Sequence, residues 1–243
     1  MKHPISTIPA FGILYSEMRK FLKNVPELKR LRNSGDAAAE RELLRRETGA
    51  WAERTSRRLK INYEINGEEN IPESGPIMVY CNHQSLSDIA AILYLFRNHF
   101  QMGFIAKNEW RKIKPLADSI EYTRSVFLIR DNAREAVRAL NEASWLLDQG
   151  FSLTIFPEGT RAKSSVVGTF KPGSFKFAQK AGVPILPVSI NGSYHIWEET
   201  GDFQPNTSIT VTVHPLVHTE QMSRQEQLEA FKQIEQLIRS DIS

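Results

Sequence analysis

The chain has 243 residues, of which 41% are hydrophobic and 24% are charged, a composition typical of one globular unit with a sizeable core. Its single cysteine, Cys81, excludes an intramolecular disulfide and fits a reducing compartment. No run reaches the roughly 18–20 apolar residues that a membrane span needs. The N-terminus also lacks the apolar core and cleavage site of a signal peptide. We therefore expect a cytoplasmic protein that does not span a bilayer.

The net charge of +3 conceals an uneven distribution. Residues 1–60 carry 14 lysines and arginines against 7 acidic residues, so this segment has a charge of +7 and the rest of the chain −4. A basic segment favours an anionic partner surface, although it is equally compatible with a solvated helix face. No nucleic-acid-binding motif accompanies the charge, so we expect no nucleic-acid partner.

The first helix is predicted over residues 11–24, with an interruption near Pro26. Apolar residues recur there at spacings of three and four, and three basic residues lie between them: Phe11, Leu14, Tyr15, Met18, Leu22 and Val25, with Arg19, Lys20 and Lys23. Such an amphipathic helix is suited to lie in the interface of an anionic membrane. The alternative is that its apolar stripe packs on the core of the protein, and the two interpretations can coexist.

A second helix is predicted from an N-cap at Asp36 to about Leu59. From residue 61 onward, short apolar runs alternate with helical stretches. The strands are expected at 61–65, 77–81, 102–106, 126–129, 152–156, 185–190 and 209–213, and the helices near 86–97, 131–149, 172–181 and 221–240. This order predicts an α/β fold with a mixed, largely parallel central sheet flanked by helices and preceded by an N-terminal amphipathic helical segment. We expect residues 1–60 to form the membrane-associating helical segment and residues 61–243 the α/β domain.

His83 and Asp88 are the first candidates for catalysis. His83 follows an apolar strand, at the end of which ligands bind in open α/β sheets, and Asp88 falls in the first turn of the next helix. The carboxylate can then hold one imidazole nitrogen and leave the other to accept a proton. The simpler alternative is a histidine at a strand end and an aspartate at a helix N-terminus, where carboxylates are favoured anyway.

Other chemistry has weaker support. The chain has no Gly-x-Ser-x-Gly nucleophile elbow, and we expect Cys81 to be a small buried core residue. The histidines lack the spacing of metal ligands, so no metal site is expected.

The second candidate motif is Phe156-Pro157-Glu158-Gly159-Thr160-Arg161, a turn that leaves another apolar strand. Gly159 lets backbone N–H groups approach an anion, and the Arg161 guanidinium is suited to bidentate phosphate binding. Glu158 can hold a substrate hydroxyl or position Arg161. The motif is also compatible with an ordinary surface turn that contains a Glu/Arg pair.

Three further cations are expected near the same place. Lys107 and Arg130 fall at the carboxyl ends of two strands, and Lys171 lies at a helix start within Phe170-Lys171-Pro172-Gly173. Each alone is more often a surface charge, but together they suit a phosphate group.

With these motifs, the chain resembles the glycerolipid acyltransferases of the 1-acylglycerol-3-phosphate acyltransferase family. Four ordered blocks carry the resemblance: Asn82-His83 with Asp88, the segment 124–130 ending in Arg130, Phe156–Arg161, and Val183-Pro184-Ile185-Leu186-Pro187-Val188. The segments 106–109 and 170–173 also resemble the family, and the similarity spans roughly residues 60–200.

The resemblance implies transfer of a fatty acyl group from acyl-CoA or acyl-carrier protein to the free hydroxyl of 1-acylglycerol-3-phosphate, which gives phosphatidic acid. His83 is then the general base and Asp88 its orienting partner. The glycerol phosphate is expected on Lys107, Arg130, Glu158, Gly159, Thr160, Arg161 and Lys171, and the acyl side on Val183, Pro184 and Ile185. No cofactor is implied, acyl-carrier protein is a possible partner, and attachment to the cytoplasmic face of the membrane is expected through residues 11–24.

The departures from the family pattern concern the acceptor. Arg124 stands where the family commonly has glycine, and we expect it to alter the acceptor pocket or add a phosphate contact. Glycerol-3-phosphate, another lysophospholipid or a lyso-amino-acid lipid remain alternative acceptors. A non-catalytic lipid-binding protein and a hydrolase are further alternatives, which the His83/Asp88 pair and the missing nucleophile elbow respectively disfavour.

Overall fold

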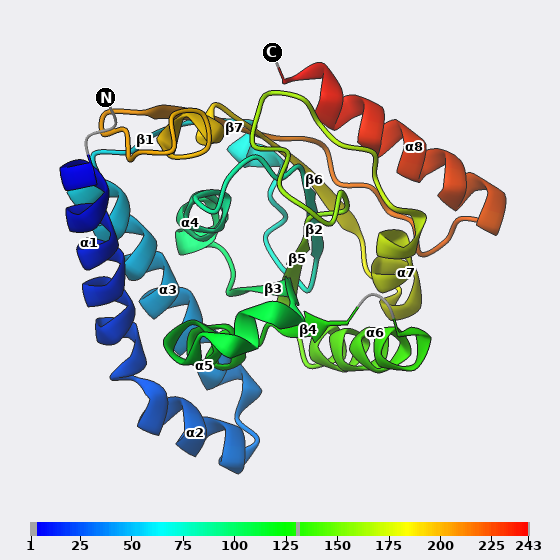
Figure 1. Cartoon of the computed structure of the whole chain (residues 1–243). Coiled ribbons are helices and arrows are strands. Elements are labelled where there is room, and N and C mark those ends of the chain that lie inside the picture. Colours follow the sequence, from blue (N-terminus) through cyan, green and yellow to red (C-terminus); the bar gives the residue numbers. More distant parts are fainter. Residues whose placement is uncertain (1–3, 130–131, 243) are drawn as a thin grey trace.

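The computed structural model describes residues 4–129 and 132–242. A seven-stranded sheet in the order β1-β7-β6-β2-β5-β3-β4 forms its centre (Figure 1). The strands are β1 (Asn62–Asn66), β2 (Met78–Cys81), β3 (Met102–Lys107), β4 (Val126–Leu128), β5 (Ser152–Ile155), β6 (Ile185–Asn191) and β7 (Ser208–Val213).

Five neighbouring strands run parallel: β6, β2, β5, β3 and β4. β7 is antiparallel to β6, and β1 is parallel to β7. The prediction of a mixed, largely parallel sheet is therefore confirmed. Because the carboxyl ends of the five parallel strands share one edge, the loops that leave them are brought together there.

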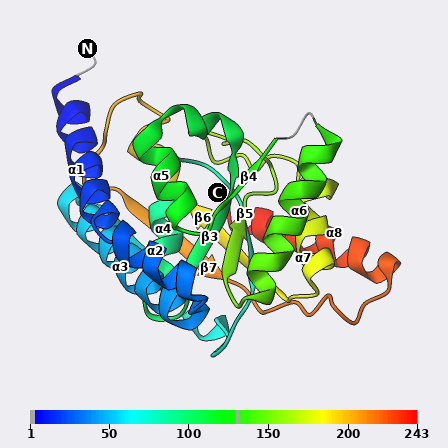
Figure 2. The same cartoon turned by 90° about the horizontal axis from the view of Figure 1, so that it is seen from below.

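Helices cover both faces of the sheet. Figure 2 shows α1–α3 and α4 on one side and α6–α8 on the other. The helices are α1 (Pro4–Leu22), α2 (Val25–Ser34), α3 (Ala37–Leu59), α4 (Asp88–Leu95), α5 (Lys114–Tyr122), α6 (Ala133–Asp148), α7 (Pro172–Ala181) and α8 (Arg224–Ser240), with a short 3-10 helix η4 at Ser193–Ile196. Among the described helices, none has the length and apolar content to cross a membrane.

The N-terminal helices differ in part from the prediction. The expected N-cap is confirmed, because the Asp36 side chain accepts a hydrogen bond from Ala39 N. α1 begins at Pro4 rather than near residue 11, and Pro9 is accommodated close to the helix start. α2, with Pro26 in its first turn, and α5 were not predicted. Both are short, with few apolar residues to give a periodic pattern.

The N-terminal helices share the core of the sheet. The last N-terminal helix ends at Leu59 and the first strand begins at Asn62. Phe21 of α1 and Leu28 of α2 nevertheless lie in the same buried cluster as Met78 of β2. The apolar residues of α1 divide between two directions: Phe21 is buried, while Phe11 and Tyr15 remain exposed.

A buried glutamate fastens α1 to α3. The Glu17 side chain is fully buried and pairs with Lys20 of its own helix and with Arg54 and Arg58 of α3, at distances of 2.6–2.8 Å. Burial raises the pKa of Glu17, but the hydrogen bonds from these three cations outweigh it and lower the pKa from its ordinary 4.5 to about 2. Part of the positive charge of the N-terminal segment thus serves internal ion pairs.

Replacing Glu17 by glutamine is expected to cost about 2 kcal/mol of stability at pH 7, or roughly 4–8 °C in Tm. The partners Arg54 and Arg58 keep some solvent contact, which limits the loss. Because the folded-state pKa lies below the ordinary value, the contribution of Glu17 is present above pH 4.5 and is lost as the pH falls towards 2. The difference in Tm between the two proteins should therefore shrink between pH 7 and pH 3.

Glu27→Gln is the matched control, since Glu27 forms an exposed pair with Arg30, and its Tm should equal that of the wild type. An equal Tm for wild type and Glu17→Gln at pH 7 would show that this ion-pair cluster does not hold the helices together.

Candidate active site

The loop after β2 is held firmly at the carboxyl edge of the sheet. Asn82 is fully buried, donates through Nδ2 to Ile190 O and accepts from Ile190 N, both at 2.8 Å. Gln84 is also buried, and its Oε1 accepts a hydrogen bond from Ser193 N. These two side chains fasten the segments on either side of His83 to β6 and to the turn that follows it.

His83 and Asp88 form the expected pair. Asp88 is fully buried in the first turn of α4, and its Oδ2 lies 2.7 Å from His83 Nδ1. The same oxygen accepts hydrogen bonds from the backbone N–H groups of Gln84 and Ser85. The carboxylate therefore fixes both the loop and the imidazole, and His83 Nε2 is the nitrogen left to accept a proton.

An aromatic ring supports the imidazole. His83 stacks on Phe156, with ring centroids 4.0 Å apart and an angle of 15° between the rings. Phe156 in turn stacks on Phe104 at 6.3 Å. The sequence placed Phe156 in a motif but gave no signal for this contact, because it depends on the two loops meeting in space.

Cys81 is a buried core residue, as expected. Burial and the nearby carboxylates of Asp88 and Glu158 raise the pKa of its thiol, which disfavours the nucleophilic thiolate. Within residues 4–129 and 132–242, no cluster of three or more His, Cys, Asp or Glu residues is arranged to hold a metal ion.

Glu158 has a different position from the one expected. Its buried carboxylate accepts hydrogen bonds from His83 N at 2.7 Å and from Gly168 N at 2.6 Å, one to each oxygen. Burial raises the pKa of Glu158, and these two N–H groups oppose the effect by stabilising the charged form. The interpretation that Glu158 positions Arg161 is wrong, because Glu158 instead bridges residues 82–87, the candidate catalytic loop, and the loop 162–168.

The loop 162–168 is tied to its surroundings by further bonds. Ala162 N donates to His83 O at 2.7 Å, and Lys163 N donates to Gln84 O at 3.2 Å. Arg239 of α8 donates to the carbonyl oxygens of Val167 and Gly168. The residues around His83 are thus fixed from α4, from the turn after β5 and from α8.

Arg161 pairs with a residue that the sequence did not single out. Its Nη1 lies 2.9 Å from Glu198 Oε1, and the side chains are 27% and 5% exposed respectively. Glu198 follows η4, beyond the fourth sequence block, and no motif or spacing marks it. Glu198 comes close to Arg161 because β6, which precedes Glu198, and β5, which precedes Arg161, both flank β2.

Four of the five other predicted anion-binding residues lie within the described part of the chain. Lys107 ends β3, Lys171 is the N-cap of α7, and Lys171 N donates to Pro157 O, so both belong to the same edge of the sheet. Gly159 has a φ of 73°, as its turn requires, and Thr160 is exposed. Arg130 lies outside the described residues.

The residues predicted to line the acyl site lie at the edge of the sheet opposite to His83. Val183 and Pro184 precede β6, and Ile185 is its first residue, paired with Met78 at the start of β2. Val183 and Ile185 are buried in the core. They therefore lie at the amino edge of the sheet, roughly 15 Å along the strand direction from His83. The block supports the sheet and does not line a pocket beside the imidazole.

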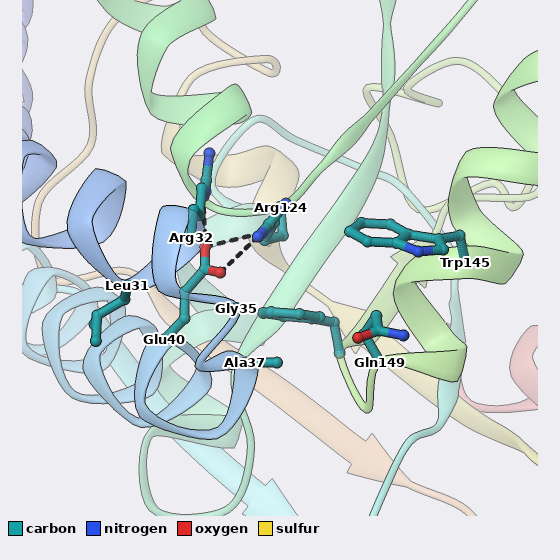
Figure 3. A pocket seen from close by; sticks show the side chains of 9 residues that line it. Leu31, Arg32, Gly35, Ala37, Glu40, Arg124, Trp145 and Gln149 are labelled. Carbon is teal, nitrogen blue, oxygen red and sulfur yellow. Dashed lines mark hydrogen bonds and ion pairs between the residues drawn. The ribbon is translucent and has the colours of Figure 1, made fainter.

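Arg124 is also at the amino edge, just before β4. Its guanidinium pairs with the buried Glu40 of α3 at 2.6 and 2.9 Å, and Arg32 pairs with the same carboxylate (Figure 3). Trp145 and Phe151 lie beside the guanidinium. The expectation that Arg124 contacts the acceptor is wrong: it joins α2, α3 and β4 on the side away from His83.

Comparisons with known proteins found similar sequences and a similar structure. A family model described as Acyltransferase matches residues 62–191. A 1-acyl-sn-glycerol-3-phosphate acyltransferase of Borreliella burgdorferi is 30% identical over 68% of this chain and 66% of its own length. A probable enzyme of the same name from Mycoplasma genitalium is 40% identical over 53% of this chain and 49% of its own length. The chain thus spans about half to two thirds of these relatives.

A solved structure extends the likeness to nearly the whole chain. The 1-acyl-sn-glycerophosphate (LPA) acyltransferase PlsC from Thermotoga maritima superposes with a TM-score of 0.78 and 32% identity, covering 98% of this chain and 95% of that one. The likeness includes the N-terminal helices, which lie outside the family model.

Gly168→Ala is expected to loosen the catalytic loop, because a Cβ at this position would lie 2.6 Å from Glu158 Oε2. Displacement of the carboxylate would release His83 N. Hydrogen–deuterium exchange of residues 82–88 should therefore accelerate by about tenfold, the equivalent of one charged hydrogen bond. Gly173→Ala, where a Cβ has open space, is the matched control and should exchange like the wild type. Unchanged exchange in Gly168→Ala would contradict the bridging role of Glu158.

Proposed function

The chain belongs to the acyltransferase family, and we propose that it transfers a fatty acyl group to the free hydroxyl of 1-acylglycerol-3-phosphate, giving phosphatidic acid for phospholipid synthesis. The 2.7 Å contact between His83 Nδ1 and Asp88 Oδ2, at the edge of the sheet that also carries Arg161, supports the proposal most strongly. The names of the relatives in Borreliella burgdorferi and Thermotoga maritima point to the same acceptor.

In this proposal His83 Nε2 accepts the proton of the acceptor hydroxyl as the oxygen attacks the thioester carbonyl. Asp88 stabilises the imidazolium that forms and holds the ring in place on Phe156. The new C–O bond forms, the C–S bond breaks, and the proton passes from His83 to the departing thiolate. No acyl-enzyme is needed, which agrees with the burial of Cys81.

Arg161, Lys107 and Lys171 are proposed to hold the phosphate, with the backbone around Gly159 and Thr160 and with Arg130. Arg161 is partly exposed and can direct its remaining N–H groups towards an anion. Glu158 contributes by fixing the loop, since both of its oxygens already accept backbone hydrogen bonds. Acyl-CoA and acyl-carrier protein are both candidate donors, and no cofactor is proposed.

The identity of the acceptor is tested by an assay that compares several acceptors. Purified protein is incubated with acyl-CoA or acyl-carrier protein and with lysophosphatidic acid, glycerol-3-phosphate or a phosphodiester lysophospholipid, and thioester loss and lipid product are measured. The proposal predicts the highest kcat/KM with lysophosphatidic acid. A higher value with another acceptor would replace the proposed substrate and keep the reaction class.

His83→Ala should lower kcat by about 10²–10⁴-fold, because general base catalysis typically supplies that factor. Asp88→Asn should also lower kcat strongly, since an amide cannot stabilise the imidazolium. His218→Ala is the matched control: this histidine is exposed and pairs with Glu220. Near wild-type kcat in His83→Ala would contradict the proposed mechanism.

We further propose that α1 attaches the protein to the cytoplasmic face of an anionic membrane. Ile8, Phe11 and Tyr15 are 71%, 57% and 52% exposed, an unusual run of apolar side chains on one helix. Arg19, in the last turn of the helix, and Lys23, just after its end, are also exposed. The face that meets solvent thus combines apolar and basic residues, whereas the opposite face carries Glu17 and Phe21 into the core.

Vesicle sedimentation tests the attachment. Ile8→Ser with Tyr15→Ser should weaken binding to both anionic and zwitterionic vesicles by about tenfold, because buried apolar area is lost. Arg19→Ser with Lys23→Ser should weaken binding by about tenfold to anionic vesicles alone. Val137→Ser removes an exposed apolar side chain from α6 and is the control. Binding unchanged in both double variants would exclude α1 as the membrane contact.

A further inference from the structure

Glu198 is the feature of the site that the proposed reaction does not use. Its side chain is 5% exposed, and its Oε1 lies 2.9 Å from Arg161 Nη1. Leu86 N, in the catalytic loop, also points at Oε1, at the longer distance of 3.4 Å. Among the described residues, Oε2 is buried and has no hydrogen-bond partner. The carboxylate therefore contacts both halves of the site while only one of its oxygens is paired.

Such a carboxylate is costly for the fold. A buried charge whose oxygens are incompletely paired loses hydration without full compensation, and a single pair with a partly exposed arginine rarely makes up for that loss. The neighbouring Glu199, which pairs with His195 at the surface, is 52% exposed and carries no such cost. The buried position of Glu198 thus calls for a role other than stability.

The segment that carries Glu198 is rigidly placed. Glu198 N donates to Tyr194 O, and Ser193 N donates to Gln84 Oε1 in the catalytic loop. On the other side, Thr7 of α1 donates to Asp202 Oδ1 and accepts from Phe203 N. Trp197, next to Glu198, contacts Phe11 of α1, with ring centroids 5.0 Å apart and the rings tilted by 36°. The carboxylate is therefore fixed relative to both His83 and α1.

We propose that Glu198 is a positioning and specificity-determining residue that fixes the guanidinium of Arg161 and balances its charge at the phosphate site. This inference rests on the proposed function of Arg161 in holding the acceptor phosphate. Because one edge of the guanidinium is bound to Glu198, the remaining N–H groups are directed at the acceptor in one orientation. The negative charge at the same time weakens binding of the phosphate.

The charge effect depends on the acceptor. A carboxylate close to the phosphate opposes a doubly charged phosphomonoester about twice as strongly as a singly charged phosphodiester. Glu198 therefore narrows the difference in affinity between these two classes of acceptor, and it lowers the affinity for a phosphomonoester product by the same means. A site with Arg161, Lys107 and Lys171 but without Glu198 would hold phosphomonoesters more tightly.

Three substitutions separate the two effects. Glu198→Gln keeps a carbonyl oxygen for Arg161 and removes the charge, so KM for lysophosphatidic acid should fall by about three- to tenfold with kcat within about twofold of the wild type. KM for a lysophosphatidylglycerol acceptor should fall less. Glu198→Ala also removes the oxygen, so Arg161 loses its orientation and kcat should fall by about ten- to a hundredfold. Glu199→Gln, at the exposed neighbouring position, is the matched control.

Binding measurements keep the inference testable if the proposed reaction fails. If the wild type shows no turnover with lysophosphatidic acid, the proposed function is wrong. Calorimetric titration with glycerol-3-phosphate still compares affinities, and Glu198→Gln should then bind it about three- to tenfold more tightly than the wild type. Unchanged KM and affinity in Glu198→Gln, or equal changes in KM for phosphomonoester and phosphodiester acceptors, would overturn the inference. A lowered Tm with unchanged kinetics would assign Glu198 a structural role alone.

Discussion

The buried carboxylate of Glu158 joins the two loops on which the site depends. One oxygen accepts the N–H of His83 and the other that of Gly168, so the turn after β5 holds the loop after β2 in register. Asp88 performs the same task from the helix side, with one oxygen shared by His83 Nδ1 and the N–H groups of Gln84 and Ser85. The imidazole is thereby held in one orientation, which is the preorganisation that the proposed proton transfer requires.

Contacts between residues distant in the sequence fix the segments around the His83 loop. Asn82 fastens β2 to β6, Gln84 fastens the catalytic loop to η4, and Arg239 of α8 fastens the loop 162–168. α1 reaches the same region through Thr7, which contacts the segment that carries Glu198. The helix proposed to contact the membrane and the arginine proposed to hold the phosphate are thus joined through one short segment, residues 197–203.

The sequence predicted those parts of the site that depend on local order. His83 and Asp88 meet because they belong to one strand–loop–helix unit, and the strand pattern placed Lys107, Arg161 and Lys171 at one edge of the sheet. The sequence-based prediction failed for residues whose position depends on the direction of a strand or whose partner is distant in the sequence. Val183–Ile185 match a family block but lie at the opposite edge, because β6 runs parallel to β2 and only its far end reaches the site. Arg124 pairs with Glu40, and Glu158 accepts hydrogen bonds from the N–H groups of His83 and Gly168. No spacing in the sequence indicates these partners. Glu198 carried no signal at all.

A structure of the protein with lysophosphatidic acid bound, in the absence of an acyl donor, tests the central claim most directly. The account predicts the free hydroxyl oxygen within about 2.6–3.2 Å of His83 Nε2, with the phosphate on the N–H groups of Arg161 that Glu198 leaves open. A headgroup bound away from Arg161, or a hydroxyl that points away from His83 while the phosphate is correctly held, would contradict it.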